Sequence, residues 1–294
     1  MLGSVLTAMV TPFKANGSVD VDRFRELATF LVDNGSDGLV VCGTTGESPT
    51  LSDKEKLLLF AVARETVGER ASVIAGTGTY DTAHSVHLTQ QAATLGVDAV
   101  LVVTPYYNKP PQRAIVKHFE AIAAASDLPI IAYNIPGRVV VNIEPITIQR
   151  LADIDTVVAV KQAHDNLDEA RFIAEQTRLT LYSGDDPNTL AFLDVGARGV
   201  VSVTAHLWGR QIAEMIRLHG QGDDEGALAL DAEMQPSYDL LKIQTNPIPI
   251  KAALNLMGHG VGGHRLPMVE PSKDELAQVR SCLERSGLLV PTSA

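Results

Sequence analysis

Cysteine is scarce in this sequence: its 294 residues include two, Cys42 and Cys282. They lie far apart and match no CxxC pattern, which excludes a disulfide-rich scaffold and a cysteine-based zinc cluster. We therefore expect both thiols to be reduced, as is usual in a cytoplasmic protein.

Long hydrophobic runs and an excess of basic residues are also missing. No apolar stretch approaches the roughly 20 residues of a membrane-spanning helix, so we expect no contact with a membrane. Asp and Glu (35) outnumber Lys and Arg (24), and the net charge of −11 argues against a nucleic-acid partner. The first apolar run begins at Val5 with no basic segment before it, so we expect no secretion signal and a cytoplasmic location.

The sequence does contain a series of eight short apolar runs at fairly even spacing. They are rich in Val, Ile and Leu without polar alternation, which is typical of parallel strands buried on both faces. The runs cover residues 5–10, 38–42, 72–75, 99–103, 129–132, 157–160, 179–182 and 199–203.

Helical patterns lie between these runs. Residues 53–67 follow a capping residue, Ser52, with Glu55 placed as its capping-box partner. Similar patterns cover residues 20–34, 82–95, 112–125, 144–152 and 166–176. The alternation of strand and helix predicts an α/β fold, a (β/α)8 TIM barrel. An open doubly wound sheet is the alternative, but it usually has fewer units, and no GxGxxG follows the first strand.

The strand pattern stops after residue 205. Helices are predicted over residues 207–220, 223–242, 246–257 and 272–286, interrupted by Pro236 and by the loop 258–267. We predict a catalytic barrel over residues 1–224 and a C-terminal helical region over residues 225–294. No low-complexity linker separates the two, so the helical region is expected to pack on the barrel.

One lysine stands at the end of a predicted strand, where side chains form the active face of such a barrel. This is Lys161, which follows the sixth apolar run, although burying an ammonium is costly. One interpretation is a lysine whose ammonium reaches solvent from the strand end. The other is a Schiff-base lysine in a dry site that favours the free amine, which can then attack a ketone.

Three further features are predicted to share this face. Tyr133 ends the fifth strand and could relay protons to Lys161, with a core aromatic residue as the alternative. The glycine-flanked turn 43–46 (GTTG) could hold a carboxylate with its amides and hydroxyls, or could simply connect strand and helix. The guanidinium of Arg138 suits a second carboxylate, with a surface arginine as the alternative. Their conjunction on one face favours the functional interpretation of each.

Several segments resemble one known family. The matching segments are GTTGE (43–47), TPYYNKP (104–110), YNIPGR (133–138), Lys161, SGDD (183–186) and RLP (265–267). They are similar to the 4-hydroxy-tetrahydrodipicolinate synthases, also called dihydrodipicolinate synthases, over essentially the whole chain. This family belongs to the class I pyruvate aldolases, together with N-acetylneuraminate lyase. The Thr-Thr pair in GTTGE and Arg138 favour the synthases over the lyases.

The resemblance implies a reaction. Lys161 forms an imine with pyruvate, and the derived enamine adds to the aldehyde of L-aspartate 4-semialdehyde. The product is 4-hydroxy-tetrahydrodipicolinate, for diaminopimelate and lysine biosynthesis. The covalent intermediate avoids a free carbanion and needs no other cofactor and no metal.

The resemblance also assigns residues to roles. The proton relay consists of Tyr133, Thr45 and Tyr107, the last contributed by a neighbouring subunit. Substrate binding falls to Thr44, Thr45, Arg138, Gly184 and the backbone carbonyl of Val201 near the lysine. The implied assembly is a homotetramer built as a dimer of dimers.

Two residues near the site depart from the usual family pattern. Gln162 stands where an acidic residue is common, but strand alternation should turn it away from the site, so we expect little catalytic effect. Val139 replaces a common Thr or Ser beside Arg138 and could loosen the orientation of that arginine.

A third departure concerns feedback inhibition. The positions that bind inhibitory lysine in relatives correspond here to Asp53, Lys56, Tyr80 and His84. A cationic Lys56 is a poor host for the ammonium of lysine. We therefore expect weak or absent inhibition by lysine.

Three other patterns have simpler interpretations. His84 and His87 are spaced like metal ligands, but no third ligand accompanies them, so a solvated helix face is expected. Asp185 and Asp186 could bind Mg²⁺, but a polar loop is favoured. The segment GVGGH (260–264) follows no strand and is not expected to bind a dinucleotide.

Alternatives to the synthase remain at this point. They are another pyruvate–lysine aldolase acting on a sugar acid, a catalytically silent binding barrel, and a metal-dependent aldolase. The combination of Lys161, Tyr133, Thr45 and Tyr107 argues against a silent barrel. No histidine cluster at the strand ends supports a metal enzyme, and Arg138 with Tyr107 favours the synthase over the other aldolases.

Overall fold

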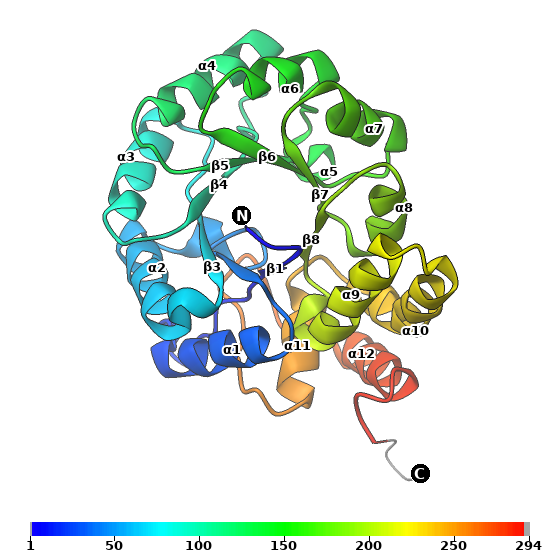
Figure 1. Ribbon diagram of the computed structural model, residues 1–294. Helices are drawn as coiled ribbons and strands as arrows, with labels where there is room; N and C mark the ends of the chain where they lie inside the picture. The colour runs from blue at the N-terminus through cyan, green and yellow to red at the C-terminus, as the bar shows by residue number, and fades with distance from the viewer. Residues whose placement is uncertain (1, 291–294) are drawn as a thin grey trace.

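Parallel strands form the centre of the molecule. The structure, a computed structural model, describes residues 2–290. Within them eight strands close into a barrel in sequence order, with β1 paired to β8 (Figure 1). The strands are β1 (Val5–Ala8), β2 (Gly38–Val41), β3 (Ser72–Gly76), β4 (Ala99–Val103), β5 (Ile130–Asn134), β6 (Val157–Gln162), β7 (Thr180–Ser183) and β8 (Gly199–Ser202). The predicted TIM barrel is confirmed.

Helices surround the barrel on its outside (Figure 1). They are α1 (Val21–Asp33), α2 (Asp53–Val67), α3 (Thr82–Ala93), α4 (Gln112–Ala123), α6 (Pro145–Ala152), α7 (Leu167–Gln176), α8 (Thr189–Asp194) and α9 (Ala205–Gly220). The predicted capping box at Ser52 is present, with Glu55 as its partner. Two short helices were not predicted, α8 and α5 (Pro136–Val139), because neither is long enough to show a helical period.

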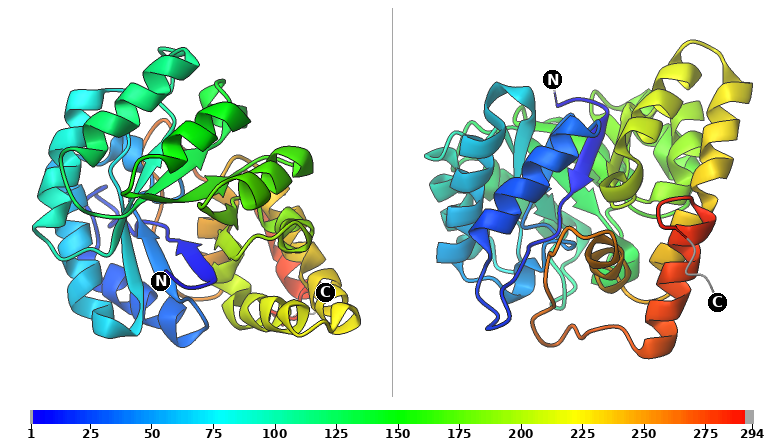
Figure 2. Two further views of the ribbon diagram at one scale, coloured as in Figure 1. Left: turned by 45° about the horizontal axis from the view of Figure 1, so that its top comes forward. Right: turned by 90° about the horizontal axis from the view of Figure 1, so that it is seen from below.

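Three helices follow the barrel: α10 (Asp224–Lys242), α11 (Ile248–Leu256) and α12 (Lys273–Arg285). Figure 2 shows α10 and α12 side by side along one flank, with the chain between them crossing one end of the barrel. The predicted break at Pro236 is wrong, because α10 runs through it. Met234 and Tyr238 on either side are buried against α9, and this packing outweighs the hydrogen bond that proline removes. The division of the chain at residue 224 stays a prediction.

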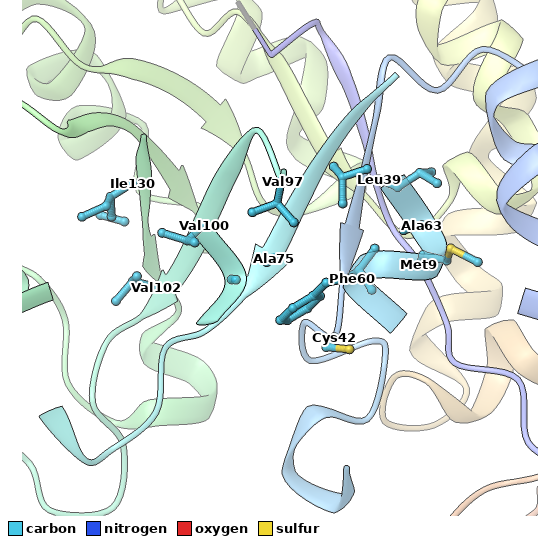
Figure 3. Close-up of a cluster of buried hydrophobic side chains, with 14 of the residues drawn as sticks. Met9, Leu39, Cys42, Phe60, Ala63, Ala75, Val97, Val100, Val102 and Ile130 are labelled. Carbon is cyan, nitrogen blue, oxygen red and sulfur yellow. The ribbon is translucent and has the colours of Figure 1, made fainter. Parts of the chain in front are cut away.

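Alternating side chains of the strands enter two different cores. One set packs outward against the helices, and part of it, including Leu39, Val100 and Ile130, is drawn in Figure 3. The other set fills the barrel and includes Ala159 and Tyr133. Since Ala159 points inward, the residue two positions later, Lys161, shares its side of β6. The strand period therefore directs this ammonium into the barrel.

The first residues of α9 contain a buried histidine that makes stability sensitive to acid. His206 is 1% exposed; its Nε2 accepts from the Val10 amide (3.2 Å) and its Nδ1 donates to the Val203 carbonyl (2.8 Å). These bonds fix the neutral ring, because Nε2 must keep its lone pair. Burial lowers the pKa of His206 from 6.5 to about 4, with the Val203 carbonyl opposing the shift.

We expect the protein to lose stability in acid in part through His206. The unfolded chain binds the proton more tightly, so this stabilisation is complete above pH 6.5 and is lost as the pH falls toward 4. The loss is on the order of 2–3 kcal/mol between pH 7 and pH 4.5. Urea unfolding at both values should show a smaller loss for His206→Gln than for the unmodified protein. The control, His87→Gln on an exposed helix face, should keep the full loss. If all three proteins lost the same unfolding free energy between the two pH values, the prediction would be contradicted.

Candidate active site

A cavity of about 550 Å³ opens at the carboxyl end of the barrel strands. The structure brings together six of the predicted site residues in its wall: Thr44, Thr45, Tyr133, Arg138, Lys161 and Gly184. They come from four separate strand ends, as the barrel architecture requires.

Lys161 lies in the wall of this cavity and is almost fully buried, with 5% of its surface exposed. In the sheet register it stands between Tyr133 of β5 and Tyr182 of β7. Its Nζ is 4.1 Å from the centroid of the Tyr133 ring. The lysine is therefore held inside the barrel beside a phenol, and the alternative of an ammonium that reaches bulk solvent does not describe it.

The segment 43–47 (GTTGE) forms a tight turn after β2. The amide of Gly46 donates to the Gly43 carbonyl (3.1 Å), and that of Glu47 donates to the Thr44 carbonyl (3.1 Å). Cys42 and Glu47, at the two ends of the turn, both have left-handed backbone angles, with φ of 56° and 57°. Such angles are costly for residues other than glycine, so the surrounding structure must hold the turn in place.

Asn246 is a site residue that the sequence analysis missed. It lies between α10 and α11, lines the cavity, and donates from Nδ2 to Thr45 Oγ1 (2.8 Å). This bond uses a lone pair of the Thr45 oxygen, which leaves the hydroxyl hydrogen free to point elsewhere. The Oδ1 atom of Asn246 is buried without a hydrogen-bond partner among the described residues. No strand precedes Asn246, so the strand-end rule could not find it.

Arg138 lies at the exposed mouth of the cavity, in the short helix α5. Its Nη2 donates weakly to the Asn246 carbonyl (3.3 Å) and to Thr245 Oγ1 (3.4 Å). Such long bonds leave the guanidinium fork available for an anion at the mouth. Val139 beside it is buried, and its side chain faces a neighbouring hollow.

The two remaining substrate-binding predictions differ in their placement. Gly184 packs directly on Lys161, since a Cβ there would lie 3.0 Å from Lys161 Cε and 2.7 Å from Ala163 Cβ. Val201 is buried in β8 among the side chains that fill the barrel. Val201 itself does not line the cavity, but Val203, two residues further along the chain, does.

For the Schiff-base reaction predicted from the sequence, replacing Gly184 with alanine is expected to slow the attack of Lys161 on a ketone by roughly tenfold or more. The added methyl group would push the lysine chain or Ala163 out of position, and misplacement by about 1 Å costs up to a hundredfold. The rate of pyruvate-dependent adduct formation measures this directly. Gly137→Ala is the matched control, because Gly137 lines the same cavity and its Cβ would meet nothing within 4 Å. Equal rates for the two variants would contradict the prediction.

Tyr107 does not join the cavity of its own chain. Its side chain is 92% exposed and its φ is 70°, so an unfavourable backbone angle presents a large aromatic residue to the outside. A second, mostly apolar hollow of about 210 Å³ lies beside the cavity and shares Thr44, Tyr133 and Arg138 with it. The role of Tyr107 in a neighbouring subunit stays a prediction.

Gln162 points away from the cavity, as the strand period predicts. It is fully buried on the helix side of β6, where its Oε1 accepts from Asn134 Nδ2 (3.0 Å). Its Nε2 lies 2.5 Å from His164 Nε2, and Glu169 accepts from it at 3.4 Å. The residue therefore belongs to a polar network behind the strand that carries Lys161.

The residues at the positions where relatives bind inhibitory lysine contact other residues of this chain. His84 Nε2 is 2.9 Å from both carboxylate oxygens of Asp53, and Lys56 is 5% exposed. The ring of Tyr80 packs edge-on against Tyr106, with centroids 5.3 Å apart. The Asp53 carboxylate is thus already engaged.

The patterns that suggested metals have other roles. Asp186 is buried and accepts from Ser202 Oγ and from the amides of Val203 and Thr204, so it fixes the start of α9. His87 lies on an exposed helix face. No group of three metal-binding side chains occurs within residues 2–290.

Comparison with known proteins identifies the family. The model of the dihydrodipicolinate synthetase family (DHDPS) matches residues 1–286. The chain belongs to this family. The DHDPS family prediction from the sequence motifs is thereby confirmed.

Individual relatives agree over nearly the whole chain. The 4-hydroxy-tetrahydrodipicolinate synthase of Moorella thermoacetica is 49% identical over 289 residues, covering 98% of this chain and 99% of its own. That of Desulforudis audaxviator is 50% identical over 292 residues, covering 98% of each chain. The crystal structure of DHDPS from Cyanidioschyzon merolae with lysine bound is 42% identical, with a TM-score of 0.96 over 98% of this chain and 99% of that one. None of the helices in residues 2–290 is both long and apolar enough to cross a membrane.

Proposed function

We propose that this protein condenses pyruvate with L-aspartate 4-semialdehyde to give 4-hydroxy-tetrahydrodipicolinate, in the biosynthesis of diaminopimelate and lysine. The observation that carries the proposal is the buried Lys161 beside Tyr133 in a cavity shared with the GTTGE turn. Membership of the DHDPS family supports this lyase over the sugar-acid aldolases and over a silent barrel. A cytoplasmic location fits a biosynthetic enzyme.

Lys161 supplies the covalent chemistry without an external cofactor. Its amine attacks the pyruvate ketone, and loss of water gives the imine. Removal of a proton from the pyruvate methyl group then gives the enamine, since the imine nitrogen accepts the electron pair. The enamine carbon attacks the aldehyde, and the new alkoxide takes up a proton. Finally the substrate amine attacks the imine carbon, closes the ring and releases Lys161.

Tyr133 and Thr45 handle the protons of these steps. The Tyr133 ring lies beside Lys161 Nζ, close enough for its phenol to serve the imine and the adjoining carbon. Thr45 is oriented by Asn246, which occupies one lone pair of its hydroxyl oxygen. A barrel interior that excludes most water strengthens each of these hydrogen bonds.

The two carboxylates of the substrates are bound at different depths. The hydroxyls and amides of the turn, at Thr44 and Thr45, bind the carboxylate of pyruvate near Lys161. Arg138 at the mouth binds that of the semialdehyde. Gly184 leaves space beside Lys161, and the backbone carbonyl of Val201 is included in the proposed site because the family resemblance implies it.

Tyr107 completes the relay in a partner subunit. Its exposure and left-handed backbone suit a side chain that enters another copy of the chain. The apolar hollow beside Thr44 and Tyr133 suits the incoming ring. The proposal includes a homotetramer built as a dimer of dimers.

Trapping of the imine tests this function. The protein is incubated with pyruvate, reduced with borohydride and digested, and the peptides are measured by mass spectrometry. We expect a pyruvate-dependent mass on the peptide that carries Lys161, and none with Lys161→Ala. Consumption of L-aspartate 4-semialdehyde, compared with sugar aldehydes, then identifies the second substrate. Absence of the adduct would refute the Schiff-base mechanism.

L-Lysine at sub-millimolar concentrations is expected to inhibit the reaction weakly or not at all. The Asp53 carboxylate is bound to His84, and the nearby Lys56 ammonium repels that of lysine. Initial rates measured over a series of lysine concentrations at fixed substrate provide the check. Strong inhibition in that range would show the expectation to be wrong.

A further inference from the structure

A fully buried ion pair lies behind the GTTGE turn, outside the cavity wall. Lys251 of α11 is 0% exposed, and its Nζ is 2.9 Å from Oε1 of Glu47, whose side chain is 1% exposed. The same Nζ donates to the carbonyl oxygens of Thr11 (3.0 Å) and Gly263. All three ammonium donors are therefore used within the protein.

Such a pair needs an explanation other than stability. Burial removes both charges from water, and exchanging a buried pair for apolar side chains of similar volume is often neutral or stabilising. Burial lowers the pKa of Lys251, and the Glu47 carboxylate opposes this shift. Neither residue lines the cavity, so neither reacts with substrate.

The contacts of the pair converge on the turn. Glu47 ends the turn in the left-handed conformation, and its Oε2 accepts from the Arg265 amide (3.1 Å). Thr11, whose carbonyl Lys251 binds, donates from Oγ1 to the Gly46 carbonyl (2.8 Å). Lys251 thus holds the turn directly through Glu47 and indirectly through Thr11.

We propose that Lys251 and Glu47 are positioning residues that fix the GTTGE turn, so that Thr44 and Thr45 present their donors to the carboxylate of pyruvate. The inference rests on the proposed function for the identity of that ligand. The backbone strain at Glu47 is the reason for the pair, since a turn with this angle would relax without a fixed anchor. Helix α11, in the region that follows the barrel, therefore belongs to the pyruvate site, together with Asn246 just before it.

The test removes both charges at once with the double variant Lys251→Met/Glu47→Gln, which leaves no unpaired charge. Pyruvate saturation of the Lys161 adduct is measured by borohydride trapping. We expect the concentration for half-saturation to rise at least tenfold, with the KM for the semialdehyde unchanged and the Tm within a few degrees. Glu47→Asp, which keeps both charges and shortens the anchoring side chain by one methylene, should show a smaller rise and serves if the double variant does not fold.

Arg64→Met is the matched control. It removes the Arg64–Asp98 ion pair (2.8 Å) at the other end of the barrel, beside a hollow lined by Leu2 and Gly3. It should lower the Tm and leave pyruvate saturation unchanged. Unchanged half-saturation in the double variant, or an equal rise in Arg64→Met, would overturn the proposal.

Amide hydrogen exchange separates this proposal from the proposed function. The amides of Gly46, Glu47 and Ser48 close the turn by bonding to its own carbonyls. They should exchange faster in the double variant without any substrate, and unchanged exchange would refute the anchoring. A missing pyruvate adduct in the unmodified protein would refute the proposed function, while the exchange rates would still decide the anchoring.

Discussion

Replacing Tyr133 with phenylalanine is expected to lower kcat by about 10²–10³-fold, within the range that general acid–base catalysis contributes. The ring keeps its packing against Lys161, since only the hydroxyl is removed. The lysine should still form its imine slowly, because its amine is intact. Steady-state rates and borohydride trapping on the same samples measure the two effects separately.

Tyr182→Phe is the matched control for this substitution. Tyr182 flanks Lys161 on the opposite strand and is equally buried, but its hydroxyl donates to the Gly3 carbonyl (2.8 Å) at the other end of the barrel. Its loss should cost about 1 kcal/mol of unfolding free energy and little activity. If Tyr133→Phe kept a kcat as high as that of Tyr182→Phe, the hydroxyl of Tyr133 would have no role in proton transfer.

The position of Lys161 could be predicted from the sequence because a strand has a period of two. Once the apolar runs were counted as parallel strands, Lys161 and its neighbour Gln162 had to face opposite sides. The structure places one in the cavity and the other in a polar network behind β6. Both assignments follow from the alternation of side chains along one strand and from the closure of the strands into a barrel.

Asn246 and Lys251 could not be predicted in this way. They reach the GTTGE turn because α11 packs across the end of the barrel, and no local pattern encodes where a helix docks. The prediction of a helix break at Pro236 was wrong for a related reason. Tertiary packing of α10 on α9 outweighed the local effect of the proline. Contacts distant in sequence therefore complete a site whose central residues are set by local periodicity.

Replacing Arg138 with alanine is expected to lower kcat/KM for L-aspartate 4-semialdehyde by about 10²–10³-fold, because a charge-assisted bidentate contact is lost. Formation of the pyruvate imine should be unaffected. Arg138 lies at the mouth, and its hydrogen bonds are to Thr245 and Asn246 rather than to Lys161. Steady-state kinetics with each substrate varied in turn separates the two effects.

The control for the loss of positive charge is Arg171→Ala, on an exposed face of α7 with one weak contact to Asp168 at 3.5 Å. It should leave both substrates unaffected. If Arg138→Ala impaired pyruvate adduct formation as strongly as use of the semialdehyde, the arginine would serve the shape of the cavity rather than the second carboxylate. A selective effect would instead mean that the mouth distinguishes the aldehyde, while the buried lysine and the turn serve pyruvate alone. Binding of the two substrates would then depend on separate parts of the fold. The semialdehyde would depend on α5, and pyruvate on the GTTGE turn and its anchor in α11.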